Sequence, residues 1–186
     1  MWKLIFLSVA LASVLGAKAS EAQMGGRLSV EPYIGYNFFG GLPESDSKIE
    51  PDIAYGGRVA YQLAPQWALF GNFQRSTPEF VLETTGVTAS FGERNVDHWS
   101  AGVEFSYVPR GGAEGMLPIL LEVGAGQARY EGGTSDTAVN LGIASSIQFT
   151  PQIAIRYGVN DYISNYNGGD GIVNQVTARV GAEISF

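Results

Sequence analysis

The sequence predicts an all-β protein, an eight-stranded antiparallel up-and-down transmembrane β-barrel. Apolar and polar residues alternate along most of the chain. Long polar loops and short turns alternate as the connections between these segments. One face of these segments is rich in both charge and glycine. Successive side chains of a strand point to opposite faces, so each segment has one apolar and one polar face.

Length and composition limit the alternatives. A chain of 186 residues fits one domain, and after its first residues it lacks an apolar run long enough for a transmembrane helix. The net charge of −7 argues against nucleic acid as a partner. The chain has no cysteine and one histidine, which excludes thiolate chemistry and a multi-histidine metal site. We therefore expect neither a metal nor a cofactor.

Residues 1–22 have the pattern of a secretory signal peptide. A short basic start precedes an apolar core, Leu4–Leu15, which is too short to span a membrane as a helix. Small residues then suit cleavage after Ala19 or after Ala22. The sequence thus predicts an exported protein whose barrel domain covers residues 23–186.

The first four strands are predicted from strict alternation. In the first, Val30, Ile34 and Phe38 share one face with other apolar residues. The predicted segments are Arg27–Phe38, Ile53–Leu63, Trp67–Gln74 and His98–Val108. A polar loop, Gly40–Asp52, follows the first strand. The longest connection, Arg75–Val96, contains a small predicted hairpin whose arms are too short to span the membrane.

The last four strands continue the same pattern. They are predicted at Leu117–Tyr130, Thr137–Phe149, Ile153–Asn160 and Val176–Phe186. Ser145 is the polar exception on the apolar face of its strand. Two short Pro-Gln turns, at Pro65 and Pro151, have similar flanking sequences, so both should lie at the periplasmic end. Proline is tolerated there because a turn has no ladder hydrogen bond to lose.

The two faces favour a membrane barrel over a soluble one. The apolar face holds the bulky and aromatic residues, and its aromatic residues sort into two belts as expected at bilayer interfaces. The opposite face holds four arginines, four glutamates and many glycines. Glycine weakens an exposed strand, whereas in a narrow lumen it leaves room for long charged side chains.

These features resemble the small outer-membrane β-barrel families grouped around the OmpA transmembrane domain and the opacity-type surface proteins. The resemblance rests on the Phe186 ending, the Pro-Gln turns and the strand Arg156–Tyr162, in which Asn160 replaces the family's arginine. It implies a location in the outer membrane of a Gram-negative bacterium. It also implies that the last strand, with Val180, Ile184 and Phe186, is read by the barrel-assembly machinery.

The charged residues of the inward face are predicted to form a network of lumenal ion pairs, because charges removed from water must be paired. The set is Arg27, Glu31, Arg58, Glu104, Glu122, Arg156, Arg179 and Glu183. An eight-stranded barrel is just wide enough to be filled by side chains. We therefore predict a closed barrel with a structural or surface-interaction role. The alternative is a small passive pore in which the pairs rearrange.

A second alternative is a lipid A deacylase-like hydrolase. His98 and Ser100 are two residues apart, as in those enzymes, and Glu104 lies on the same face, so the residue types for an activated serine are present. The pattern nevertheless places them inward, on the fourth strand, whereas the deacylase pair lies on a late strand and faces lipid. We therefore predict that the protein is not an enzyme.

Three acidic loops offer oxygen ligands, which Ca²⁺ prefers. They are Glu44–Asp52, Glu79–Asp97 and Asn165–Asp170, and none has a known calcium-ligand spacing. Solvated acidic loops are the better interpretation. The expected partners are outer-membrane lipid or lipopolysaccharide, the assembly machinery, and a surface ligand bound through these loops.

Overall fold

The computed structural model describes residues 26–41, 47–84, 87–108, 117–165 and 171–186. The predicted signal peptide and its cleavage sites lie outside these residues. Every regular element in the described part of the chain is a β-strand. These residues contain no helix that is both long and apolar enough to cross a membrane.

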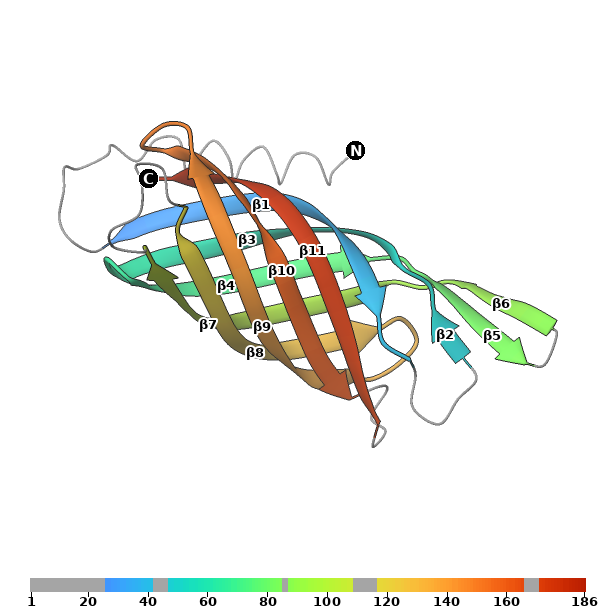
Figure 1. Ribbon diagram of the computed structural model, residues 1–186. Helices are drawn as coiled ribbons and strands as arrows, with labels where there is room; N and C mark the ends of the chain where they lie inside the picture. The colour runs from blue at the N-terminus through green and yellow to red at the C-terminus, as the bar shows by residue number, and fades with distance from the viewer. Residues whose placement is uncertain (1–25, 42–46, 85–86, 109–116, 166–170) are drawn as a thin grey trace, which may run out of the picture.

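Eight antiparallel strands close into a barrel in the order β1-β11-β10-β9-β8-β7-β4-β3 (Figure 1). The strands are β1 (Arg27–Phe39), β3 (Asp52–Ala64), β4 (Trp67–Ser76), β7 (Val96–Tyr107), β8 (Ile119–Tyr130), β9 (Ser135–Gln148), β10 (Ile153–Asn165) and β11 (Ile172–Ser185). Closure satisfies the backbone hydrogen bonds of every barrel strand, which leaves no open edge in the membrane. The predicted fold class is confirmed.

A separate three-stranded sheet extends from one end of the barrel (Figure 1). It consists of β2 (Ser47–Ile49), β5 (Glu79–Thr84) and β6 (Val87–Glu93), in the order β2-β5-β6. The hairpin β5–β6 falls within the predicted long connection. We call this the sheet end of the barrel, and the opposite end, which carries Arg27 and Phe186, the terminal end.

The structure corrects the prediction of a continuous polar loop at Gly40–Asp52. Residues 47–49 form β2, and Ile49 pairs with Phe80 of β5. Three residues are too few to show an alternating pattern, and β2 exists because its backbone pairs with a strand distant in sequence. The strand ends β4, β7, β10 and β11 also extend into predicted loops because their ladders continue beyond the apolar band.

The outward face of the barrel is apolar, as the alternation predicts. Large apolar side chains are exposed all along it, among them Ile34, Val59, Leu69, Val123, Ile143 and Val180. Aromatic rings contact one another near both ends: Trp67 meets Phe105 towards the terminal end, and Phe73 meets Trp99 towards the sheet end. Ser145 is tolerated on this face because its hydroxyl donates to the carbonyl of Pro118 at 2.7 Å.

Candidate functional site

The inward face fills the lumen with layers of different chemistry. Nearest the terminal end, six charged side chains on six strands form what we call the charged layer. Its members are Glu31 on β1, Arg58 on β3, Glu104 on β7, Glu122 on β8, Arg156 on β10 and Arg179 on β11. All six are buried. Three carboxylates and three guanidinium groups balance in charge, which is the condition for burying them together.

Glu122 is the centre of the charged layer because it contacts all three guanidinium groups. Its Oε1 lies 2.5 Å from Nη2 of Arg156, 2.9 Å from Nη2 of Arg179 and 3.3 Å from Nε of Arg58. The amide of Asn160 donates to Oε2 of Glu122 at 2.8 Å. One carboxylate therefore connects β3, β8, β10 and β11 across the lumen.

The other two carboxylates complete the charged layer. Nη2 of Arg58 lies 2.6 Å from Oε2 of Glu104, and Arg156 donates to the same oxygen. Glu31 lies farther away, with Oε2 at 3.4 Å from Nε of Arg156 and 3.9 Å from Nη1 of Arg58. Arg58 and Arg156 therefore each interact with all three carboxylates, so the layer is one network rather than separate pairs.

Aromatic and small residues shape the space around this network. The guanidinium carbon of Arg58 lies 5.2 Å from the centre of the Phe70 ring, and that of Arg179 lies 5.0 Å from the Tyr33 ring. A Cβ atom on Gly142 would lie 2.9 Å from Oε2 of Glu122 and closer still to Asn160. A side chain at position 142 would therefore have to displace the ends of the Glu122 and Asn160 side chains, whose space glycine leaves free.

The remaining two charged residues predicted for the network lie at its margin. Glu183 is partly exposed, and its Oε2 lies 3.7 Å from Nη1 of Arg156. Arg27 lies outside the charged layer: its exposed side chain donates to the carbonyl of Pro151 in a turn. It begins β1 at the mouth of the barrel, so its inward position in the alternation does not bring it to the carboxylates.

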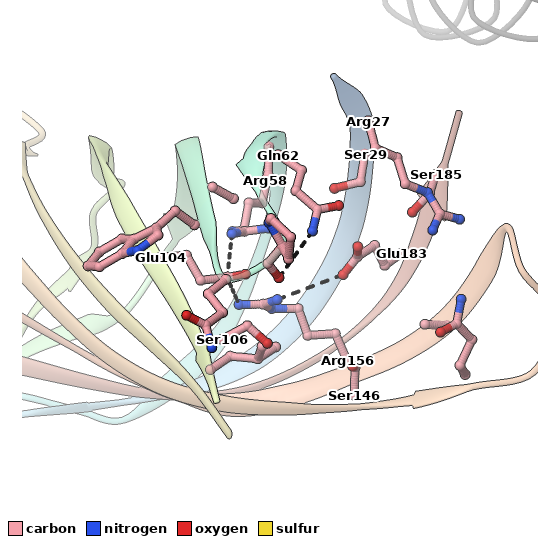
Figure 2. Close-up of a pocket in the computed structure, with 18 of the residues that line it drawn as sticks. Arg27, Ser29, Arg58, Gln62, Glu104, Ser106, Ser146, Arg156, Glu183 and Ser185 are labelled. Atoms are coloured by element: carbon pink, nitrogen blue, oxygen red, sulfur yellow. Dashed lines mark hydrogen bonds and ion pairs between the residues drawn. The ribbon is translucent and has the colours of Figure 1, made fainter. Parts of the chain in front are cut away.

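A cavity of about 160 Å³ lies between the charged layer and the turns of the terminal end (Figure 2). Figure 2 shows the side chains of Arg58, Glu104 and Arg156 linked by ion pairs within it. Serine and glutamine side chains line much of the rest, together with residues of both Pro-Gln turns. This end of the lumen is therefore polar, and the charged layer closes it off.

Neutral polar side chains fill the lumen on the other side of the charged layer. The amide of Gln74 donates to Asn37 and to Thr177, each at 3.1 Å, and Thr177 donates to Asn37 at 2.6 Å. Asn72 donates to the hydroxyl of Tyr162, which is almost fully buried. These contacts join β1, β4, β10 and β11.

An apolar cluster, which we call the outer cap, fills the lumen at the sheet end. Ile49 and Phe80 come from the small sheet and pack against barrel residues. The outer cap consists of Ile49, Phe80, Val96, Ala128, Tyr130, Ala138 and Val173. The alternation of the sequence does not predict this cluster. Its signal was the run of apolar residues at inward positions where the strands enter their loops, such as Val96 and Val173.

The structure does not assemble the three candidate catalytic residues. The ring of His98 packs against that of Tyr162, with centroids 4.6 Å apart, and Ser100 accepts a hydrogen bond from Asn140 at 3.3 Å. Glu104 forms ion pairs with Arg58 and Arg156. Four residues of strand separate Glu104 from Ser100, or roughly 13 Å. All three side chains are buried in the lumen, where they do not meet lipid.

In the described residues of the acidic loops, no group of three acidic or histidine side chains is placed to hold a metal ion. Residues 44–46, 85–86 and 166–170 of these loops lie outside the described part. Of the predicted assembly signal, Val180 is half-exposed on the outward face, and the Phe186 amide donates to the carbonyl of Leu28 at 2.8 Å. Recognition of this strand by the assembly machinery stays a prediction.

Comparison with known proteins identifies the fold. No protein-family model and no curated protein sequence matches the chain. Among solved structures, Neisserial surface protein A has a TM-score of 0.56 at 11% identity, covering 89% of this chain and 100% of its own. Outer membrane protein OprG from Pseudomonas aeruginosa has a TM-score of 0.60 at 9% identity, covering 89% and 98%. The amino-terminal barrel domain of OprF from the same organism has a TM-score of 0.50 at 12% identity, covering 88% and 100%.

The chain therefore has the fold of a small, eight-stranded outer-membrane β-barrel, as the sequence resemblance implied. Its apolar outward face and closed ladder match the membrane location predicted for it.

Proposed function

We propose that this protein is a closed outer-membrane barrel whose role is structural or surface-interacting, and that it is not a passive pore. The observation that carries the proposal is the filling of the lumen by the charged layer at one level and the outer cap at another. An ion crossing the barrel would have to displace both. The chain would lie with its terminal end in the periplasm and its small sheet at the cell surface.

The small sheet supports the surface part of the proposal. It projects beyond the barrel, and its outer strand, β6, carries an exposed aromatic ring at Phe91. Acidic side chains of Glu50, Asp52, Glu79 and Glu93 line a shallow cavity beside it. These groups lie clear of the apolar band, where a soluble partner has access to them.

A liposome-swelling assay tests closure. The purified barrel is reconstituted into vesicles loaded with an impermeant polymer, and the vesicles are diluted into isotonic solutions of small sugars. We expect the swelling rate of protein-free vesicles, because no continuous water path crosses the lumen. A reconstituted porin of known activity is the control. Swelling in the presence of this protein at a rate that rises with its amount would contradict the proposal.

A sheet-trimmed barrel separates the two proposed roles. Residues 79–93 are replaced by a short turn, and the variant is returned to cells that lack the protein. If the barrel acts structurally, resistance to detergent and to large antibiotics should be restored by both versions. If the small sheet binds a surface partner, only the full chain should restore adhesion of the cells to the surfaces they colonise. Equal failure of both versions in every assay would contradict the proposal.

One observation favours the pore alternative. The polar cavity at the terminal end already occupies part of the lumen, so a rearrangement of Arg58 and Arg156 would extend it. The liposome assay decides between the two. No comparable observation favours the hydrolase, because His98, Ser100 and Glu104 have separate partners.

A further inference from the structure

A row of charged side chains crosses the outward face at the sheet end. In the strand register, Arg75 on β4 lies opposite Asp97 on β7, and Asp97 lies opposite Arg129 on β8. Both carboxylate oxygens of Asp97 are engaged by Arg75: Nε lies 2.5 Å from Oδ1 and Nη2 lies 2.7 Å from Oδ2. We call these three residues the outward row.

The height of the outward row places it at the edge of the apolar band. Asp97 lies ten residues from Tyr107, which is near the other edge on the same strand. With a rise of about 3.4 Å per residue and a strand tilt of about 40°, this corresponds to roughly 25 Å, the height of the apolar band of such barrels. The ring pair Phe73–Trp99 lies directly below the row, as an interfacial aromatic belt should.

The outward row carries an excess of positive charge. Arg75 is partly exposed and Arg129 is exposed, and the row has one carboxylate for two arginines. Asp97 contacts Arg75 through both of its oxygens, and in the described part of the chain no carboxylate lies within ion-pair distance of the Arg129 guanidinium. At this depth an arginine costs little, and its long side chain can extend to anionic groups at the interface.

Other charged side chains lie near the outward row. Arg94 lies above the row, with its guanidinium carbon 5.8 Å from the centre of the Phe80 ring. Glu131 is nearby, and the backbone and side-chain amides of Asn95 donate to its Oε2 at 2.8 and 2.6 Å. These hydrogen bonds lower its pKa, so Glu131 is a negative charge beside the row. Two strands away from β8, β10 presents the carboxylate of Asp161 outward. The outward row together with Arg94 and Glu131 thus has three positive and two negative side chains, in a chain whose net charge is −7.

We propose that Arg75 and Arg129 bind the phosphate groups of lipopolysaccharide in the outer leaflet. A planar guanidinium matches a phosphate with two parallel hydrogen bonds, and the outward row lies at the depth where the phosphates of that lipid meet its acyl chains. Asp97 holds Arg75 extended along the barrel wall and leaves Arg129 available. The inference rests on the proposed orientation, with the small sheet at the cell surface, and is independent of whether the lumen conducts.

A titration with purified lipid A tests the assignment. The barrel without residues 1–22 is folded in detergent micelles with the substitution Trp67→Phe, so that Trp99 beside the row is its one tryptophan and reports binding by its fluorescence. Bisphosphorylated lipid A is compared with dephosphorylated lipid A and with phosphatidylglycerol. We expect saturable binding of the bisphosphorylated form only. Equal binding of phosphatidylglycerol, or of the dephosphorylated form, would overturn the assignment to this phosphate source.

The variant pair Arg75→Gln with Arg129→Gln should weaken binding about thirtyfold, since each arginine near a phosphate-bearing surface contributes roughly a factor of five. Arg27→Gln, at the other end of the barrel, is the matched control and should bind as the parent does. The heat-dependent shift in gel mobility verifies that each variant is folded. Unchanged binding by the folded double variant would overturn the proposal. Swelling assays on the same samples show separately whether the closed-barrel proposal holds.

Discussion

The charged layer and the outer cap fill the same lumen by opposite means. In the charged layer, three carboxylates and three guanidinium groups are buried together, and all of them except Arg179 have ion-pair partners on at least two strands. In the outer cap, Ile49 and Phe80 bury apolar surface, and these contacts do not depend on direction as hydrogen bonds and ion pairs do. Removing one member of a charged network costs much of the free energy of unfolding, because its partners are left buried without a counter-charge. Truncating a member of an apolar cluster costs free energy in proportion to the apolar area that is lost.

This difference predicts where the barrel is sensitive. The charged layer ties the walls of the barrel together across its middle, so damage there should affect the whole fold. The outer cap depends on a small sheet that lies outside the barrel ladder, so damage there should remain local. Variants of the charged layer and of the outer cap, each with a matched control, measure this difference in stability.

The largest effect is expected for Glu122→Gln. The change leaves three guanidinium groups with one buried carboxylate fewer, which costs about 3–5 kcal/mol of the free energy of unfolding. Glu183→Gln is the matched control, because Glu183 contacts one guanidinium from the rim and should cost at most about 1 kcal/mol. Urea unfolding in lipid vesicles measures both. Equal losses at the two positions would show that Glu122 is not the centre of the network.

A smaller effect is expected for Phe80→Ala. Truncating a buried ring costs about 3 kcal/mol, at the low end of the usual range because the small sheet can settle onto the cavity. The exposed ring of Phe91 on the neighbouring strand is the control, and Phe91→Ala should be nearly neutral. Hydrogen exchange should quicken in β5 and stay unchanged in β10. Faster exchange in β10 would mean that the outer cap and the charged layer unfold together.

The smallest effect in this series is expected for Gly142→Ala. The added methyl group would displace Glu122 and Asn160, at a cost of about 1–3 kcal/mol. Gly71→Ala is the control on the outward face, where an added Cβ meets nothing within 4 Å, and it should be neutral or slightly stabilising. The midpoints of urea unfolding compare the two. A neutral Gly142→Ala would show that the network does not need the space that glycine leaves.

The sequence predicted the barrel and the members of the charged layer for one reason. Residues such as Arg58, Glu122 and Arg156 lie on spanning strands, where the two-residue period assigns each side chain to a face. The period assigns a face but not a partner. It therefore placed Arg27 in the same set, although its position at the mouth keeps it from the carboxylates.

The two-residue period does not predict the outer cap or the small sheet. Ile49 lies in a three-residue strand, which is too short to show a period, and its packing partners Phe80 and Val173 are distant in sequence. The outward row was missed for a related reason. Arg75 and Asp97 were assigned to a loop, whereas the ladder between β4 and β7 extends to include both.

The most direct test of closure at two levels is the single-channel conductance of the sheet-trimmed barrel in a planar bilayer. In this variant, a short turn replaces residues 79–93, so the outer cap loses Phe80 while the charged layer is untouched. We predict the baseline of a protein-free bilayer, the same as for the full chain, because Glu122 and its three guanidinium partners still block the lumen. A large, steady open level in the trimmed barrel would contradict the account, since it would show that the charged layer does not close the lumen.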